Sequence, residues 1–72
     1  MHYNYCLLDT LIGTTHRYGI AAMEGAAILD AFLDLSLDRG LVTELVTQCN
    51  VLGLDLIHLP DVVEDFFVEA TR

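Results

Sequence analysis

The spacing of apolar residues near the end of the chain is the feature that most limits its fold. These residues follow one another at i, i+1, i+4, i+5 and i+8: Val62, Val63, Phe66, Phe67 and Ala70. That spacing places them on one face of a helix. Pro60 suits the first helical position, and the acidic Asp61 suits the first turn because of the helix dipole. The pattern therefore predicts a helix at about 60–71.

A second helix is expected at about 41–52, because the same apolar periodicity recurs there. Its apolar residues are Leu41, Val42, Leu45, Val46, Cys49 and Leu52. Gly40 precedes this stretch and Gly53 follows it, so both ends have a residue typical of a helix boundary.

Residues 20–39 are expected to form a central helix. Ile28, Phe32 and Leu35 can then share a side that faces the core, and Arg39-Gly40 is typical of a helix end. Opposite them, carboxylates recur at every fourth residue, with Glu24 nearby. This first acidic ridge consists of Asp30, Asp34 and Asp38.

The first nineteen residues admit two interpretations. Leu7, Leu8, Leu11 and Ile12 have helical spacing, whereas residues 3–8 can instead form a strand that pairs with residues 54–59. The helical interpretation is favoured. We therefore expect one domain, residues 1–72, with an all-α fold that is a compact bundle of three or four short helices. The alternative is an α+β fold with a short N-terminal strand.

The charge of the chain limits its partners. It has 11 acidic residues against three arginines and no lysine, which gives a net charge of −8. Direct binding to nucleic acid or to an anionic membrane is excluded, since both require basic side chains.

No apolar run reaches the length of a membrane span and the N-terminus lacks a basic region, so we expect a soluble cytoplasmic protein. Hydrophobic residues make up 54% of the 72 residues, and a domain this small has little interior. Part of the apolar surface should therefore stay exposed, which favours binding to a partner protein or the formation of a homodimer.

Carboxylates on the predicted helices are the candidate binding residues. The last helix carries a second acidic ridge at the same spacing, formed by Asp61, Asp65 and Glu69. Successive ridge residues rise about 6 Å along a helix, which is similar to the spacing of phosphates along a nucleic-acid strand. Such a ridge can imitate phosphate charge in a basic groove. The alternative is a solvated face that only keeps an apolar protein soluble.

The sequence gives little sign of metal or catalytic chemistry. The cysteines Cys6 and Cys49 and the histidines lack the spacing of a zinc site, so the thiols are expected to be free. Neither a calcium loop nor a phosphate-binding loop is present. We therefore expect no metal, no cofactor and no enzymatic activity.

One stretch, residues 34–60, resembles the acyl and peptidyl carrier proteins, which are small, acidic and helical. The matching segments are Asp34-Leu35-Ser36-Leu37-Asp38, Glu44-Leu45-Val46, Gly53 and Leu59-Pro60. The resemblance implies that Ser36 carries a phosphopantetheine arm at the start of a helix. The chain departs from the carrier pattern in two respects. Leucine precedes the serine, and Arg39-Gly40 interrupts the helix that should begin there.

The expected function is binding. We expect a small acidic inhibitor or adaptor that occupies a basic surface of a nucleic-acid-handling protein, such as a nucleic-acid-binding enzyme or complex. Nuclease immunity proteins, DNA mimics and phage anti-defence (anti-CRISPR) proteins share this size and charge, although no motif connects the chain to any of them. A structural or assembly module that forms a homo-oligomer is the alternative, and a divergent carrier that uses Ser36 is a lesser one.

Overall fold

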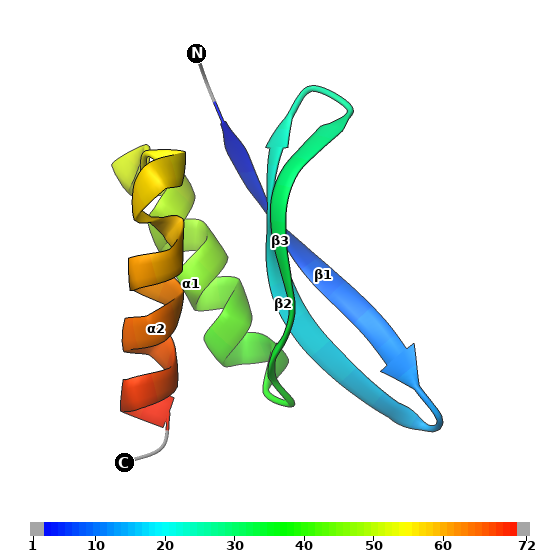
Figure 1. Ribbon diagram of the computed structural model, residues 1–72. Coiled ribbons are helices and arrows are strands. Elements are labelled where there is room, and N and C mark those ends of the chain that lie inside the picture. The colour runs from blue at the N-terminus through cyan, green and yellow to red at the C-terminus, as the bar shows by residue number, and fades with distance from the viewer. Residues whose placement is uncertain (1–2, 71–72) are drawn as a thin grey trace.

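Three antiparallel strands come first in the chain, and two helices follow (Figure 1). The computed structural model describes residues 3–70. Its elements are β1 (Asn4–Ile12), β2 (Thr15–Glu24), β3 (Ala27–Ser36), α1 (Arg39–Leu52), the short 3₁₀ helix η1 (Leu56–His58) and α2 (Leu59–Ala70). The expectation of an all-α helical bundle is therefore wrong, and the α+β alternative is the correct class.

Two tight hairpins build the sheet, whose strand order is β1-β2-β3. Ile12 lies opposite Thr15, and Glu24 lies opposite Ala27, so each loop has two residues. Each loop starts with a glycine at positive φ, Gly13 at 64° and Gly25 at 60°. Glycine adopts this conformation without steric cost, and it is the residue expected at the first central position of a type II′ hairpin turn.

The N-terminal segment is a strand, as the less favoured interpretation had it. Its partner is β2 and not residues 54–59, which form a two-residue connection, the helix η1 and the start of α2. Tyr5 and Leu7 of β1, and Tyr3 just before it, pack against the core at every second position, which is the period-two pattern of a strand.

The predicted helix at 20–39 is replaced by the second half of β2, a hairpin turn, β3 and the first residue of α1. The register between β2 and β3 shifts twice, so β3 contains extra residues that its partner lacks. Phe32 and Leu35 therefore both pack against the core although three positions separate them. This spacing resembles a helix in the sequence, but Ile28, the third member of the expected face, is 63% exposed.

Gly19 explains why β3 can approach β2 closely beside the larger irregularity. A Cβ atom at this position would lie 2.0 Å from the carbonyl oxygen of Phe32 and 2.7 Å from the carbonyl carbon of Leu33. No larger residue fits unless the strand moves.

Both later helices are confirmed, with ends within two residues of those predicted. Asp38 caps α1, because its carboxylate accepts hydrogen bonds from the amides of Gly40 (2.9 Å) and Leu41 (3.3 Å). Gly53 ends α1 in the left-handed conformation, and its amide and that of Leu54 donate to the last carbonyl groups of the helix. Within residues 3–70, neither helix is long and apolar enough to cross a membrane.

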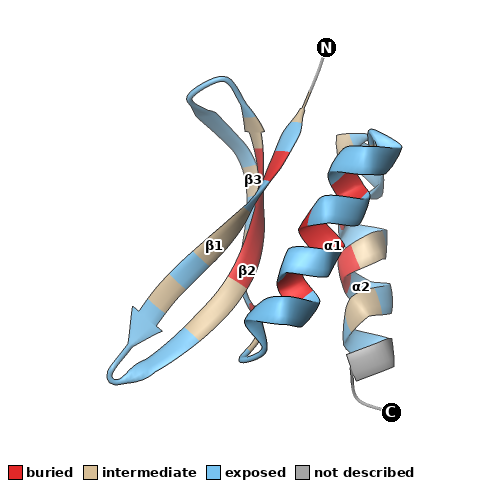
Figure 2. Ribbon diagram, turned by 180° about the vertical axis from the view of Figure 1, so that it is seen from behind, coloured by how far each residue is buried: buried red, intermediate tan, exposed pale blue. Residues whose placement is uncertain are grey.

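The core lies between the sheet and α1, with α2 adding a second helix on the same side (Figure 2). Its fully buried larger side chains come from three elements: Ile20, Val42 and Leu59. Burying an aliphatic side chain of this size contributes about 1.5–3 kcal/mol to folding. Both helices therefore pack on one face of the sheet, and no helix of residues 3–70 covers the other face (Figure 1).

A set of hydrogen bonds, here called the Tyr5 latch, joins the end of α1 to strand β1. The Tyr5 amide donates to Asn50 Oδ1 (2.7 Å), and Asn50 Nδ2 donates to the Tyr5 carbonyl oxygen (2.9 Å). The Tyr5 hydroxyl donates to the carbonyl oxygen of Leu54 (2.7 Å). The Asn50 amide thus takes the place of a neighbouring strand at this point of the outer edge of β1.

Candidate functional site

A groove lies between the two helices of the described part of the chain. It has a volume of about 270 Å³. This hollow is here called the α1–α2 groove. It is lined by Leu41, Glu44, Leu45 and Gln48 of α1, and by Val62, Asp65 and Phe66 of α2. These positions follow the i, i+3, i+4, i+7 spacing of one helix stripe, so each helix turns one stripe towards the other.

Apolar and polar side chains contribute about equally to the lining of this groove, and its apolar floor comes from four of the seven lining residues. Leu45 is buried, Val62 and Phe66 are half-buried, and Leu41 remains 45% exposed at one end. A partially exposed apolar floor of this kind can receive an apolar side chain from another molecule.

Carboxylates stand on both walls of the groove. Glu44 belongs to α1 and Asp65 to α2, and both are exposed. The ion pairs in residues 3–68 are His16–Asp9 and Arg17–Asp34, so neither groove carboxylate has a basic partner there. The groove therefore offers an apolar floor between two negative charges that are not neutralised within this part of the chain.

The second acidic ridge lies on α2, which is a helix as predicted. Asp61 and Asp65 are exposed on α2, and Asp65 also lines the groove. The side chain of Glu69 is outside the described residues. Glu44 and Gln48 were not among the predicted binding residues. Their spacing on α1 was visible in the sequence, but nothing there showed that this stripe faces α2.

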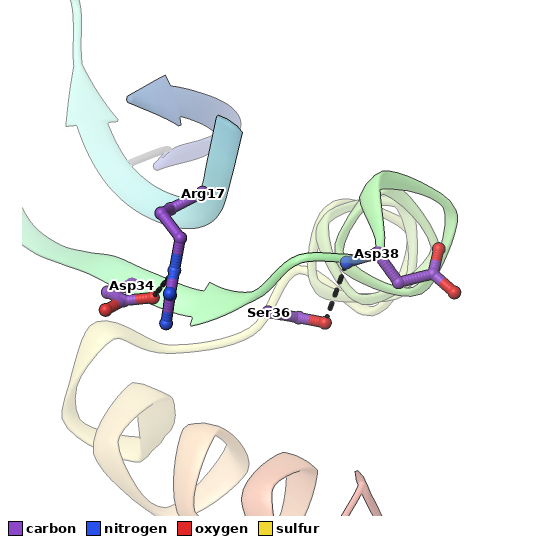
Figure 3. A network of polar contacts seen from close by, with 4 residues as sticks. All are labelled: Arg17, Asp34, Ser36 and Asp38. Atoms are coloured by element: carbon purple, nitrogen blue, oxygen red, sulfur yellow. Dashed lines mark hydrogen bonds and ion pairs between the residues drawn. The ribbon is translucent and has the colours of Figure 1, made fainter. Parts of the chain in front are cut away.

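The first acidic ridge does not exist as a helix surface, because Asp30 and Asp34 belong to β3. Asp34 accepts a hydrogen bond from Arg17 Nε at 2.7 Å (Figure 3). Asp30 lies opposite Ala22, and its carboxylate accepts from the amide of Ala31 (2.9 Å). Asp38 caps α1, so the three carboxylates have three different local roles.

Glu24, expected beside that ridge, is exposed at the end of β2 next to the second hairpin turn. It does not line the α1–α2 groove.

Ser36 ends a strand and does not begin a helix, contrary to what the carrier resemblance implies. Its Oγ accepts a hydrogen bond from the Asp38 amide at 3.0 Å (Figure 3). The hydroxyl therefore takes part in the turn between β3 and α1, and the helical architecture of carrier proteins is absent from residues 3–70.

The two cysteines are free and lie in different surroundings. Cys6 is exposed on β1, whereas Cys49 is buried on α1. Burial raises the pKa of the Cys49 thiol, which keeps it protonated and unreactive. Among the described residues, no three His, Cys, Asp or Glu side chains are grouped to hold a metal ion.

Comparisons with known proteins found no match. No protein family matches the sequence, no curated protein resembles it, and no solved structure matches its fold.

Proposed function

We propose that this protein is a small binding protein that receives a basic segment of another protein in its α1–α2 groove. The observation that carries this proposal is the groove itself, whose apolar floor lies between Glu44 and Asp65. A partner with an apolar residue flanked by arginine or lysine would complement both properties. The proposed activity is binding, without catalysis.

The charge around the groove supports a basic partner. Residues 39–68 contain Glu44, Asp55, Asp61, Glu64 and Asp65 against a single arginine, Arg39. A field of one sign draws an oppositely charged protein towards the surface and speeds association. The apolar floor then supplies the contacts that slow dissociation.

Nucleic-acid-handling proteins are the partner class that we propose, because they expose basic surfaces for phosphate. Occupying such a surface would make the protein an inhibitor or adaptor, which is the mode of action of phage anti-defence proteins and DNA mimics. Among the acidic residues of the two predicted ridges, Asp65 lines the groove and Asp61 lies one turn before it on α2, whereas Asp30, Asp34 and Asp38 do not line the groove. The two free thiols favour a reducing compartment, so we place the protein in the cytoplasm.

A binding experiment with synthetic peptides tests the groove directly. The probe is a fluorescent amphipathic helical peptide with leucines at i, i+4 and i+7 and flanking arginines, compared with the same peptide carrying glutamates. The groove variant is Glu44→Gln/Asp65→Asn. The matched control is Asp55→Asn/Glu64→Gln, which also removes two negative charges but at positions that do not line the groove.

The groove variant should bind the basic peptide about tenfold more weakly than the native protein, since two exposed ion pairs contribute up to about 1 kcal/mol each. The control should stay within about twofold, and native affinity should fall as salt is added. Equal weakening in both variants would show that only net charge matters. A pull-down at low salt with the same three proteins then identifies the natural partner by mass.

A further inference from the structure

The outer edge of β1 carries backbone groups that have no partner in the sheet. The amide and the carbonyl group of Tyr5 both bond to the Asn50 side chain, so both point away from β2. Along an antiparallel pair, residues alternate between directing these groups at the partner strand and directing them away from it. Leu7, Asp9 and Leu11 therefore direct their amides and carbonyl groups outwards, as Tyr5 does.

The hairpin turn at the end of β1 supports the same alternation. Ile12 lies opposite Thr15 across a loop of two residues, and the backbone groups of such a closing pair bond to each other. The register between β1 and β2 has no shift along the strand, so every odd residue from Tyr5 onwards points outwards. Within residues 3–70, no turn, loop or side-chain hydrogen bond reaches the outward backbone groups of residues 7, 9 and 11.

These three residues, Leu7, Asp9 and Leu11, are here called the β1 edge. The helix α1 reaches β1 at Tyr5, and the hairpin then extends away from both helices (Figure 1). The Asp9 side chain is 49% exposed and Leu11 is 59% exposed. The β1 edge is therefore accessible to another chain from Leu7 to the turn.

The opposite edge of the sheet, formed by β3, is protected. Its register with β2 shifts twice, and such bulges twist an edge and interrupt regular pairing. The Asp30 carboxylate also accepts a hydrogen bond from the Ala31 amide at 2.9 Å, which occupies that donor. Bulges, lysine and proline, which commonly protect an edge strand, are all absent from residues 7–11 of β1.

We propose that the β1 edge binds an extended basic segment of another protein as an additional antiparallel strand. An extended chain is the structure that satisfies a row of outward amides and carbonyl groups, and strand addition is a recurring mode of peptide recognition. The segment places an arginine or lysine opposite Asp9 and apolar residues opposite Leu7 and Leu11, because directly opposite side chains share a face. This site is separate from the α1–α2 groove and does not depend on it.

The charge of Asp9 favours a basic segment over a second copy of β1. If two copies pair so that Leu7 meets Leu11, Asp9 lies opposite the same residue of the copy, and like charges in this position destabilise a strand pair. A shift in one direction brings Leu11 to Tyr5, whose backbone groups already bond to Asn50. A shift in the other direction brings Leu7 to the hairpin turn.

Amide exchange with water, followed by NMR, tests the geometry and the binding together. In the free protein, the amides of Leu7, Asp9 and Leu11 should exchange much faster than that of Leu8, which points to β2. The probe is a short peptide in which valine and threonine alternate and arginine replaces the central valine. At saturation, this peptide should slow the exchange of the three outward amides at least about tenfold.

Two N-methylated forms of the peptide separate strand pairing from charge. Methyl groups on two amides that face β1, those of the arginine and a valine, should weaken binding at least about tenfold because donors are lost. Methyl groups on the two threonine amides, which face away, should change the affinity less than about threefold. Both forms carry the same charge and side chains, so each is the control for the other.

Substitutions on the protein test the charge and separate this site from the groove. Asp9→Asn should weaken binding about two- to fivefold, because an opposite-charge pair across the strands is lost. Asp61→Asn, which removes an exposed charge on α2, should bind like the native protein. The groove variant Glu44→Gln/Asp65→Asn should also keep its affinity for the extended peptide while losing affinity for the helical one. Because Asp9 also lies 2.8 Å from His16 Nδ1, a urea midpoint for Asp9→Asn confirms that it folds.

Exchange of the three outward amides that does not change with up to about 1 mM peptide would overturn the proposal. Equal affinity of the two methylated peptides would overturn it on the native chain, whatever Asp9→Asn does. Slower exchange of the same amides in the native protein alone, as its concentration rises, would show that a second copy occupies the β1 edge and would also overturn it.

Discussion

Replacing Asn50 with alanine should remove the main attachment of α1 to the edge of the sheet. The Asn50 side chain makes two hydrogen bonds to the Tyr5 backbone, at 2.7 and 2.9 Å. Each such bond contributes about 0.5–1.5 kcal/mol net, so Asn50→Ala should cost roughly 1–3 kcal/mol. A chain of 72 residues has a total stability of roughly 4–11 kcal/mol, so this loss is a large share.

Urea unfolding followed by circular dichroism measures this loss. With a slope of about 1 kcal/mol per molar urea, the midpoint should fall by about 1–3 M. Thr47→Ala is the control, because it removes an exposed hydrogen bond to the Thr43 carbonyl on the same helix and should cost no more than about 0.5 kcal/mol. Hydrogen exchange adds a local readout, since the Tyr5 amide should lose protection that Ala21 keeps. An unchanged midpoint with Tyr5 still protected would refute the reasoning.

Three further changes test other parts of the fold. Gly19→Ala should lower the free energy of unfolding by at least about 2–3 kcal/mol or prevent folding, because the new Cβ meets backbone atoms of β3. Gly13→Ala has open space around the new Cβ and only an unfavourable φ of 64°, so in a urea titration it should lower the free energy of unfolding by about 1–2 kcal/mol. Asp38→Ala should lower the urea midpoint by an amount equivalent to about 1 kcal/mol, because the helix cap is lost. Asp38→Asn should keep most of the native stability, because asparagine also caps helices. Burial raises the pKa of the Tyr5 hydroxyl above 10.0 and that of the Cys49 thiol above 9.0, so both groups ionise first in the unfolded chain. The contribution of these two groups to stability should therefore be constant below about pH 8 and fall as the pH rises above 9, and over that alkaline range the urea midpoints of Tyr5→Phe should decline less steeply.

The helical half of the fold was predictable because its signals are local. Gly53 lies where the apolar periodicity of α1 stops, and Pro60 lies at the start of the stripe on α2. Each signal depends on residues within one or two turns of helix. The predicted boundaries therefore differ from the observed ones by two residues or fewer.

The sheet was missed because two irregularities in β3 disguise its strand pattern. Phe32 and Leu35 share a face at a spacing of three, which in the sequence is typical of a helix. The better signal was the pair of glycines that open the two-residue loops, Gly13 and Gly25. A glycine between two apolar segments is typical of a hairpin turn as well as of a helix end.

The candidate site was predictable only in part. Asp65 was named from its position on an acidic helix stripe, and that stripe is present. Glu44, its counterpart across the groove, depends on how α1 and α2 lie against each other. Helix periodicity reveals which residues share a face, but not which two faces meet.

The Tyr5 latch also has a consequence for the order in which the chain folds. Both hairpins join neighbouring segments and close loops of two residues, so they can form early and fast. The latch instead joins positions 45 and 49 residues apart, and this closure carries a larger entropy cost. Its bonds should then be absent from the folding transition state. Disrupting Asn50 would accelerate unfolding and leave the refolding rate almost unchanged, so the latch would set the lifetime of the native state.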